Sequence, residues 1–196
     1  MELMMAIAVI GVILAVTIPS FNTFRLNNRM TGAANDLLAS FNLARSEAVK
    51  RQRSVGVCSS TDPGAATPTC TAPLLNTTSV GWVVWLDQNA NAALDAGEEI
   101  LSSHDTLDPA LVLTSNWQAI RYAPTGFIVV TPALPPSTPA STLLCDQRLN
   151  AGDGVQIRRR VLTVSPTGRP AVLRTAAALT VLVPFSPVVV TDCWGG

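Results

Sequence analysis

The sequence predicts an α+β protein in which one long amino-terminal helix, kinked at a proline, packs on an antiparallel β-sheet domain. Two observations predict this class. Apolar residues dominate the first 20 positions and then recur at helical spacing as far as about residue 53. Beyond that point, short β-like runs alternate with turn residues. Many short strands after a single helix are typical of a helix packed against an antiparallel sheet.

Residues 1–20 are expected to form the membrane-spanning half of the helix. Residues 3–18 contain no charge, and this run of 16 residues is slightly shorter than the ~20 that a bilayer span requires. The run lacks the basic start and the small-residue cleavage site of a removable signal peptide, which favours an anchor. Glu2 lies at its tip, where a membrane would penalise a carboxylate by at least ~2.5 kcal/mol.

Residues 21–53 are expected to continue the same helix in amphipathic form. Pro19 should kink the helix without ending it, because its ring clashes with the preceding turn. A helix of about 50 residues would be ~75 Å long at the standard rise. Its opposite face is polar and basic, and its apolar face comprises Leu26, Met30, Ala33, Ala34, Leu37, Leu38, Phe41, Ala44 and Ala48.

Residues 54–174 are predicted to form the β-rich globular domain, and residues 175–196 an apolar C-terminal tail outside it. Pro-Gly, Thr-Gly and Asp-Gly pairs separate the strands, and a proline-rich loop follows Thr131. The predicted strands are residues 54–59, 82–86, 99–102, 111–114, 119–122, 127–131, 142–146, 156–164 and 171–174.

Charge is balanced overall but unevenly distributed along the chain. The net charge is +3 over residues 1–60, −7 over residues 61–120 and +4 over the remainder, and a segment of a single sign matters more for partners than the total.

Catalytic motifs are missing from the sequence: no GxSxG, HExxH or Ser/His/Asp grouping is present, and His104 stands alone beside Asp105. We therefore predict no enzymatic activity and no cofactor, with a membrane-tethered enzyme as an alternative.

Four cysteines, an even number, predict disulfides if the domain lies outside the cytoplasm. Three pairings of Cys58, Cys70, Cys145 and Cys193 are open. A Cys58–Cys70 bridge would close a short loop, and a Cys145–Cys193 bridge would anchor the tail. A disulfide that closes a loop of this size should raise the free energy of unfolding by about 3 kcal/mol or a little more.

The acidic stretch of residues 87–98 matches positions 1, 3, 5, 9 and 12 of a calcium-loop template. Position 6 should be glycine but is Ala92, and the flanks have strand patterns where a calcium loop has helices. The favoured interpretation is therefore a solvated hairpin loop without a metal, and a calcium-stabilised adhesion or interaction module is the alternative. The candidate ligands are Asp87, Asn89, Asn91, Asp95 and Glu98.

Basic residues gather near the end of the chain. If residues 156–164 and 171–174 pair as a hairpin, their arginines should converge on one edge or end and suit phosphate groups. The alternative is that these charges are solvated and protect an edge strand from aggregation. The candidates are Arg158, Arg159, Arg160, Arg169 and Arg174.

Trp82 and Trp85 are three positions apart on one predicted strand. Their side chains should point to opposite faces of the sheet, so we expect only one of them in the core. One of them should cover the amphipathic helix face. The alternative is that the tryptophans stack on nucleic-acid bases, and the candidates are Trp82, Trp85, Trp117 and Trp194.

Four segments resemble a known family. The opening MELMMAIAVIGVILAVTIPSF resembles the amino-terminal segment of the type IV pilin superfamily. GWVVWLDQNANAALDAGEEIL, IRYAPTGF and RRRVLTVSPTGRP follow in the order seen in FimT/GspH minor pilins and pseudopilins. The resemblance implies a structural subunit of a type IV pilus or of a type II secretion pseudopilus. It also implies a single inner-membrane span, a periplasmic domain, and assembly with other pilins through the helix.

The resemblance also implies roles for particular residues. Glu2 would pair with the free amino terminus of a neighbouring subunit, and Pro19 would follow the span. Met1 would be an internal position of a precursor that is cleaved after a basic leader and methylated. FimT-type minor pilins carry a Gly-Arg-x-Arg motif associated with DNA binding during DNA uptake. Gly168-Arg169 matches it, whereas the second arginine position is Ala171, so Arg174 would have to substitute. DNA is therefore a second predicted partner.

Overall fold

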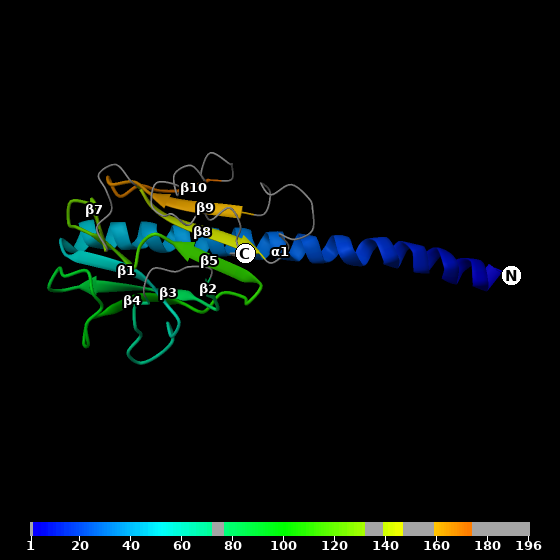
Figure 1. Ribbon diagram of the computed structural model, residues 1–196, viewed down its shortest axis with the longest axis horizontal. Coiled ribbons are helices and arrows are strands. Elements are labelled where there is room, and N and C mark those ends of the chain that lie inside the picture. The colour runs from blue at the N-terminus through cyan, green and yellow to red at the C-terminus, as the bar shows by residue number, and fades with distance from the viewer. Residues whose placement is uncertain (1, 72–76, 132–138, 147–158, 174–196) are drawn as a thin grey trace.

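The computed structural model describes residues 2–71, 77–131, 139–146 and 159–173, and for residues 2–20, 22 and 23 it describes the backbone alone. One helix and ten strands form the described part of the chain, and the strands make two antiparallel five-stranded sheets. The long helix runs along both sheets and projects far beyond them (Figure 1). The predicted α+β class is therefore confirmed.

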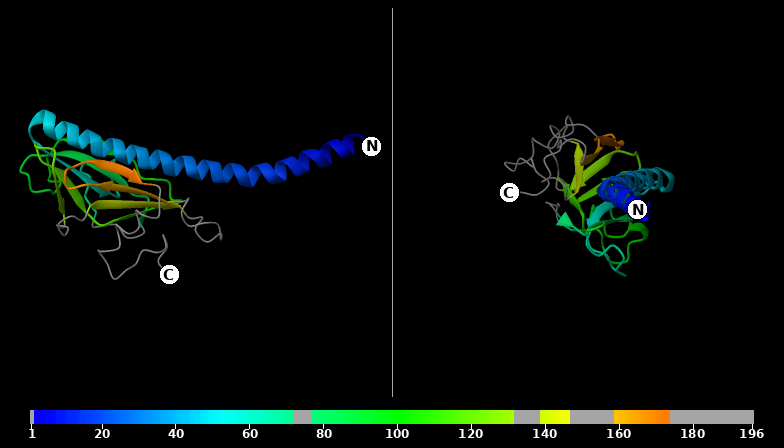
Figure 2. Two further views of the ribbon diagram at one scale, coloured as in Figure 1. Left: turned by 90° about the horizontal axis from the view of Figure 1, so that it is seen from above. Right: turned by 90° about the vertical axis from the view of Figure 1, so that its right-hand side faces the viewer.

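Helix α1 (Glu2–Arg51) is continuous through Pro19, as predicted. Figure 2 shows that it is curved, with its blue amino-terminal part turning away from the direction of the part that packs on the sheets. The helix ends two residues earlier than expected, where Gln52 adopts a left-handed φ of 54°. Within the described part of the chain, no helix has a stretch that is long and apolar enough to cross a membrane.

The two sheets contain all nine predicted strands, with small shifts at their ends, and one strand that was not predicted. The first sheet has the order β4-β3-β1-β6-β7, and the second has the order β10-β9-β8-β5-β2. The unpredicted strand, β2, has only two residues, which is too short for any alternation to be recognised. The first sheet consists of β1 (Ser54–Ser60), β3 (Gly81–Asp87), β4 (Ile100–His104), β6 (Ala119–Tyr122) and β7 (Ile128–Thr131). The second consists of β2 (Thr77–Thr78), β5 (Leu111–Ser115), β8 (Ala140–Asp146), β9 (Arg159–Val164) and β10 (Pro170–Leu173).

The main core lies between α1 and the two sheets. The apolar face of the helix, from Met30 to Ala48, packs there against Trp82, Trp117 and side chains from both sheets. Phe41 contacts Trp117 edge to face, with ring centroids 5.8 Å apart. The helix therefore holds the two sheets together instead of covering only one of them.

Both tryptophans of β3 are fully buried, so the expectation that only one would be is wrong. Trp82 faces α1, donates a hydrogen bond from Nε1 to Ser40 Oγ at 2.8 Å, and stacks on the ring of His104. Trp85 faces the other side of the sheet, where it packs with Cys58, Ala119 and the loop residues Cys70 and Leu94. The sheet is thus covered on both faces, because the loops after β1 and β3 fold over its outer side.

Candidate functional site

In the acidic loop between β3 and β4, carboxylate side chains accept hydrogen bonds from backbone N–H groups of the same loop. The carboxylate of Asp87 is 1% exposed and accepts hydrogen bonds from the backbone N–H groups of Asn91 (3.2 Å) and Ala92 (2.9 Å). Arg121 Nε lies 3.8 Å from the same carboxylate. Ala92 has a positive φ of 62°, the conformation that glycine would adopt most easily at this position of a calcium loop. The backbone therefore follows the expected tight turn despite the alanine.

The other four candidate calcium ligands also lie in this loop, and their side chains form hydrogen bonds with other residues of the loop. Asn89 Nδ2 and Asn91 Nδ2 both donate to Asp95 Oδ2 at 2.8 Å. Glu98 accepts from the backbone N–H groups of Gln88 and Asp95. Among the described residues, no group of three or more His, Cys, Asp or Glu side chains is placed to hold a metal ion. These hydrogen bonds hold the loop together from within.

The predicted convergence of the arginines is wrong for the three that the structure describes. β9 and β10 do pair as a hairpin, but Arg159 and Arg160 begin β9 and Arg169 follows its end. Five residues of extended strand place Arg159 ~17 Å from Val164, next to the turn that carries Arg169. Arg159 is buried opposite Cys145, and Arg160 is half-buried and donates to the Arg159 carbonyl oxygen. Arg158 and Arg174 lie outside the described residues.

Arg169 is presented by a tight turn at the end of β9. Gly168 has a φ of 79°, and its N–H donates to the Ser165 carbonyl oxygen at 2.7 Å. The backbone N–H of Arg169 donates to Ser165 Oγ at 3.2 Å. The Arg169 side chain is exposed, and its guanidinium has no hydrogen bond or ion pair among the described residues. The turn therefore fixes the backbone and leaves the charge available.

Arg45 of α1 reaches the same end of the domain, which the sequence did not reveal. Its Nη2 donates to the carbonyl oxygen of Thr167 at 3.3 Å, and its side chain lies against Gly126 in the turn between β6 and β7. Burial raises the pKa of the nearby Tyr122 phenol well above its usual range, and the Arg45 charge offsets this only in part. Arg45 and Arg169 are thus two cations beside one pair of packed turns.

The last turn of α1 carries basic residues whose charge is largely neutralised. Arg51 forms ion pairs with Glu47 of the helix (2.6 Å) and Glu99 before β4 (3.1 Å). The hydrogen bond from Arg51 lowers the pKa of the Glu47 carboxyl. These contacts tie the end of the helix to the first sheet, which gives this cluster a structural explanation.

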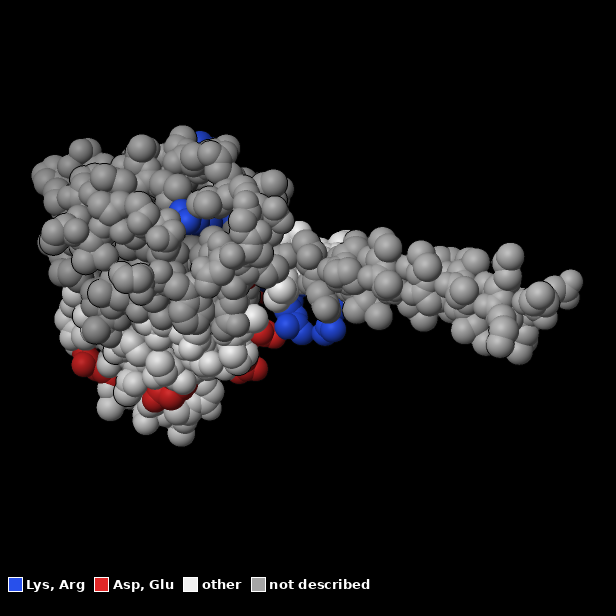
Figure 3. All heavy atoms as spheres, turned by 45° about the vertical axis from the view of Figure 1, so that its right-hand side comes forward, with Lys and Arg blue, Asp and Glu red and all other residues white. Residues whose placement is uncertain are grey.

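Charge is also separated across the surface. Figure 3 shows Asp and Glu side chains over the lower part of the domain, and Lys or Arg side chains on the helix where it leaves the domain. Arg29 of the helix pairs there with Asp108, one of the seven acidic residues of the segment 61–120. The uneven distribution of charge along the sequence therefore leads to an uneven distribution of charge over the surface.

Glu2 and Pro19, the predicted assembly residues, belong to the first 20 residues of the chain and to α1. The amino-terminal part of α1 projects from the domain (Figure 1). Among the helix side chains that the structure describes, which begin at Phe21, the first buried one is Met30. Before it, Phe21 and Phe24 are 58% and 60% exposed. These two phenylalanine side chains are therefore left largely uncovered by the described part of the domain.

One predicted disulfide is present, between Cys58 in β1 and Cys70 in the loop that follows. Cys145 in β8 is also disulfide-bonded. Its predicted partner, Cys193, lies outside the described residues. The Cys58–Cys70 bridge holds the loop after β1 against the outer face of the first sheet.

We expect replacement of both Cys58 and Cys70 by alanine to lower the free energy of unfolding by about 2–3 kcal/mol, because the unfolded chain gains the freedom of an open loop. Urea denaturation of the full chain in mild detergent measures the change. Thr61→Ala, at an exposed site in the same loop, is the control and should unfold like the wild type. An unchanged midpoint in the double variant would contradict the prediction.

Comparisons with known proteins agree with the fold. A family model described as type II transport protein GspH matches residues 33–168. The pilin-like protein PilA1 of Thermus thermophilus is 29% identical over 124 residues, which cover 63% of this chain and 64% of that protein. The chain thus spans a little under two thirds of the length of that relative.

Two solved structures are similar at low sequence identity. The type IV minor pilin FimU of Pseudomonas aeruginosa matches with a TM-score of 0.49 and 19% identity, over 74% of this chain and 89% of that chain. The minor pseudopilin EpsH of the type 2 secretion system of Vibrio cholerae matches with a TM-score of 0.47 and 13% identity, over 74% of this chain and 97% of that chain. Because the family model covers well over half of the sequence, the chain belongs to the GspH family, and the predicted class of minor pilin or pseudopilin is confirmed.

Proposed function

We propose that the chain is a non-enzymatic structural subunit of a filament, either a type IV pilus or the pseudopilus of type II secretion. Residues 3–18 would anchor it in the inner membrane before assembly, with the domain in the periplasm. Other pilins or pseudopilins would then pack against the helix. The description of the matching family, a type II transport protein, and the name of the relative PilA1, a pilin-like protein, support this class of partner.

One observation carries this proposal: α1 begins far outside the domain that buries it. Among its described side chains Met30 is the first that is buried, and about 28 helix residues, or ~42 Å of helix, precede it. The first part of this segment is apolar around its whole circumference. Such a helix needs lipid or other helices around it, and a bundle of identical helices would provide them. Glu2 would then be neutralised by the amino terminus of an adjacent subunit.

The test is Glu2→Ala in a strain that assembles the filament. We expect the subunit to accumulate in the membrane at wild-type levels while its amount in sheared filaments falls at least about tenfold, because the charged contact that aligns neighbouring helices is lost. Asp105→Ala removes an exposed carboxylate from the domain and should leave incorporation unchanged. Normal incorporation of the Glu2 variant would refute the assembly role.

We also propose that DNA binds at the end of the domain that carries Arg169. The exposed Arg169 guanidinium, which has no partner among the described residues, and the nearby Arg45 favour phosphate contacts that do not depend on base sequence. Arg159 and Arg160 lie at the other end of β9, so any role in DNA binding would require a separate contact. Roles for Arg158 and Arg174 remain predictions from the sequence.

A gel-shift titration with duplex DNA tests this site. Arg169→Ala should weaken binding several-fold and reduce the slope of log affinity against log salt by about one. Arg25→Ala removes an exposed arginine from the projecting helix and should not alter binding. If the two variants weaken binding equally, the interaction reflects overall charge and the proposed site is wrong.

A further inference from the structure

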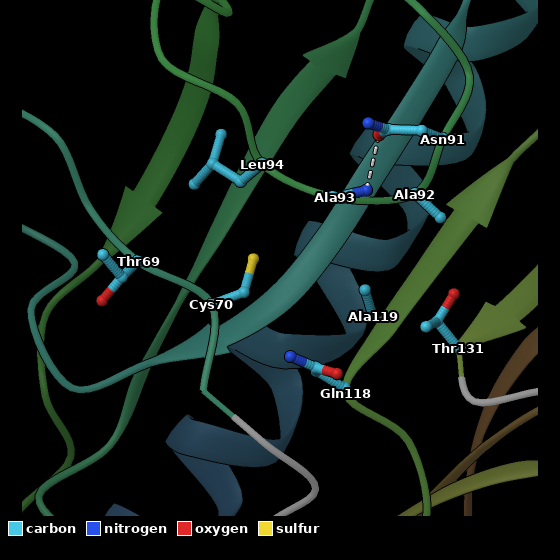
Figure 4. A pocket seen from close by; sticks show the side chains of 9 residues that line it. All are labelled: Thr69, Cys70, Asn91, Ala92, Ala93, Leu94, Gln118, Ala119 and Thr131. Atoms are coloured by element: carbon cyan, nitrogen blue, oxygen red, sulfur yellow. Dashed lines mark hydrogen bonds between the residues drawn. The ribbon is translucent and has the colours of Figure 1, made fainter.

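A pocket of about 350 Å³ opens on the outer face of the first sheet, the face that α1 does not cover (Figure 4). One wall is formed by residues 69–70 and the other by residues 91–94 of the acidic loop. Residues 118–119 and Thr131 complete the lining. The Cys58–Cys70 disulfide holds the first wall, and the hydrogen bonds of the acidic loop hold the second. The pocket is therefore built from constrained segments.

The size and lining of the pocket suit a short aliphatic group. Ala92, Ala93 and Ala119 contribute only methyl groups, and the buried indole of Trp85 packs directly against Ala119. The volume is near the lower limit of ligand pockets, and it equals roughly a dozen water molecules at ~30 Å³ each. One or two amino-acid residues would fill such a space.

The polar groups of the lining suit a peptide bond. Gln118 is half-buried, and its carboxamide has no hydrogen-bond partner among the described residues. Its backbone is fixed, because its N–H donates to the Thr131 carbonyl oxygen at 2.7 Å. A carboxamide provides one acceptor and donors side by side, which match the N–H and C=O of an extended chain. The hydroxyl of Thr131 lies on the same rim.

A carboxylate accepts hydrogen bonds from each wall of the pocket. Asp62 accepts hydrogen bonds from the backbone N–H of Thr69 at 3.0 Å and from its hydroxyl. Asp95 accepts from Asn91 Nδ2 at 2.8 Å. The hydrogen bonds lower the pKa of Asp62, so its charge persists to acidic pH. Both walls belong to the segment 61–120, which contains no lysine or arginine. The surroundings of the pocket therefore favour a cationic partner.

We propose that this pocket binds an extended basic peptide segment of a partner protein. One small aliphatic side chain, together with the backbone on either side of it, occupies the hollow between the alanines. The adjacent peptide bond pairs with the carboxamide of Gln118, and basic side chains on either side approach Asp62 and Asp95. The proposal requires neither filament assembly nor DNA binding, so it can fail while the proposed function stands, and the reverse.

A direct test titrates the full chain, in a neutral detergent, against the pentapeptide amide Lys-Ala-Leu-Ala-Lys carrying a neutral dye. Fluorescence anisotropy measures the affinity. We expect the acidic peptide Glu-Ala-Leu-Ala-Glu to bind at least about tenfold more weakly, and added salt to weaken only the basic peptide. Equal affinities for the two peptides, or no binding of the basic one, would overturn the proposal.

Two alanines of the acidic loop provide a matched pair of variants. Both are exposed, but Ala93 lines the pocket and Ala96 does not. Ala93→Trp should fill the hollow and reduce the affinity for the basic peptide at least about tenfold, whereas Ala96→Trp should leave it unchanged. Gln118→Leu should weaken binding several-fold at constant thermal stability. Wild-type affinity in the Ala93 variant, with its circular dichroism unchanged, would place the peptide elsewhere and refute the site.

Discussion

Replacing Gly168 with alanine is expected to destabilise the domain by about 3 kcal/mol. The residue has a φ of 79°, which costs an L-amino acid roughly 1–2 kcal/mol. A Cβ atom there would also lie 2.0 Å from the Gly126 carbonyl oxygen and 3.0 Å from Cε1 of Tyr122. The backbone oxygen cannot move aside without separating the two Pro-Thr-Gly turns, so the strain and the clash add.

Three other glycines separate these two contributions. Gly97 has a φ of 92° but open space around it, so Gly97→Ala should cost only the strain of roughly 1–2 kcal/mol. Gly56 has no positive φ, but a Cβ atom added there would lie 2.2 Å from the Trp85 ring, so Gly56→Ala should cost about 1–3 kcal/mol through overpacking. Gly64 has neither feature, and Gly64→Ala should remain within ~0.5 kcal/mol of the wild type.

Urea denaturation of the full chain in mild detergent would rank the four variants, provided that the slope against urea stays constant. The expected order of stability is Gly64, then Gly97 and Gly56, then Gly168 as the least stable variant. If the Gly168 variant were as stable as the Gly64 variant, the two turns would not be packed as described.

Most elements of this fold could be predicted, because local periodicity specifies them. The 3.6-residue spacing of apolar side chains predicts the part of α1 that carries Met30, Leu37 and Phe41, and these residues are buried as expected. The order of the strands could not be predicted in this way. β1 pairs with both β3 and β6, and that pairing depends on contacts between distant segments. The burial of Trp85 depends on the same long-range folding, because loops cover it.

The candidate sites show the same limit. The spacing of Asp87, Asn91 and Asp95 does bring them into one loop. Spacing does not reveal that backbone amides donate to the Asp87 carboxylate and that the Asn91 side chain donates to Asp95. The arginines lie within a short stretch of sequence, which predicted that they converge, but an extended strand separates Arg159 from the turn at Arg169. Arg45 has the pattern of an ordinary solvated helix residue. Only the fold places it 3.3 Å from Thr167.

Replacing Phe41 with alanine should have the largest effect on stability, about 3–5 kcal/mol. The side chain is fully buried at the centre of the core, where it contacts Trp117 edge to face at 5.8 Å. Its removal leaves a cavity where α1 meets the sheets, and the rigid strands cannot collapse to fill it. Leu43→Ala is the matched control, because Leu43 lies two residues away on the same helix and is 36% exposed.

The two variants also test whether α1 is an integral part of the domain. If the helix holds the sheets together, Phe41→Ala should reduce the near-ultraviolet dichroism of the buried tryptophans and accelerate hydrogen exchange in both the helix and the strands. The Leu43 variant should change neither signal and should cost less than about 1 kcal/mol. Faster exchange confined to the helix would mean that the sheets are stable without it. The amphipathic half of α1 would then be a removable stalk, and its separation from the domain would limit how firmly a filament of packed helices could hold the globular part.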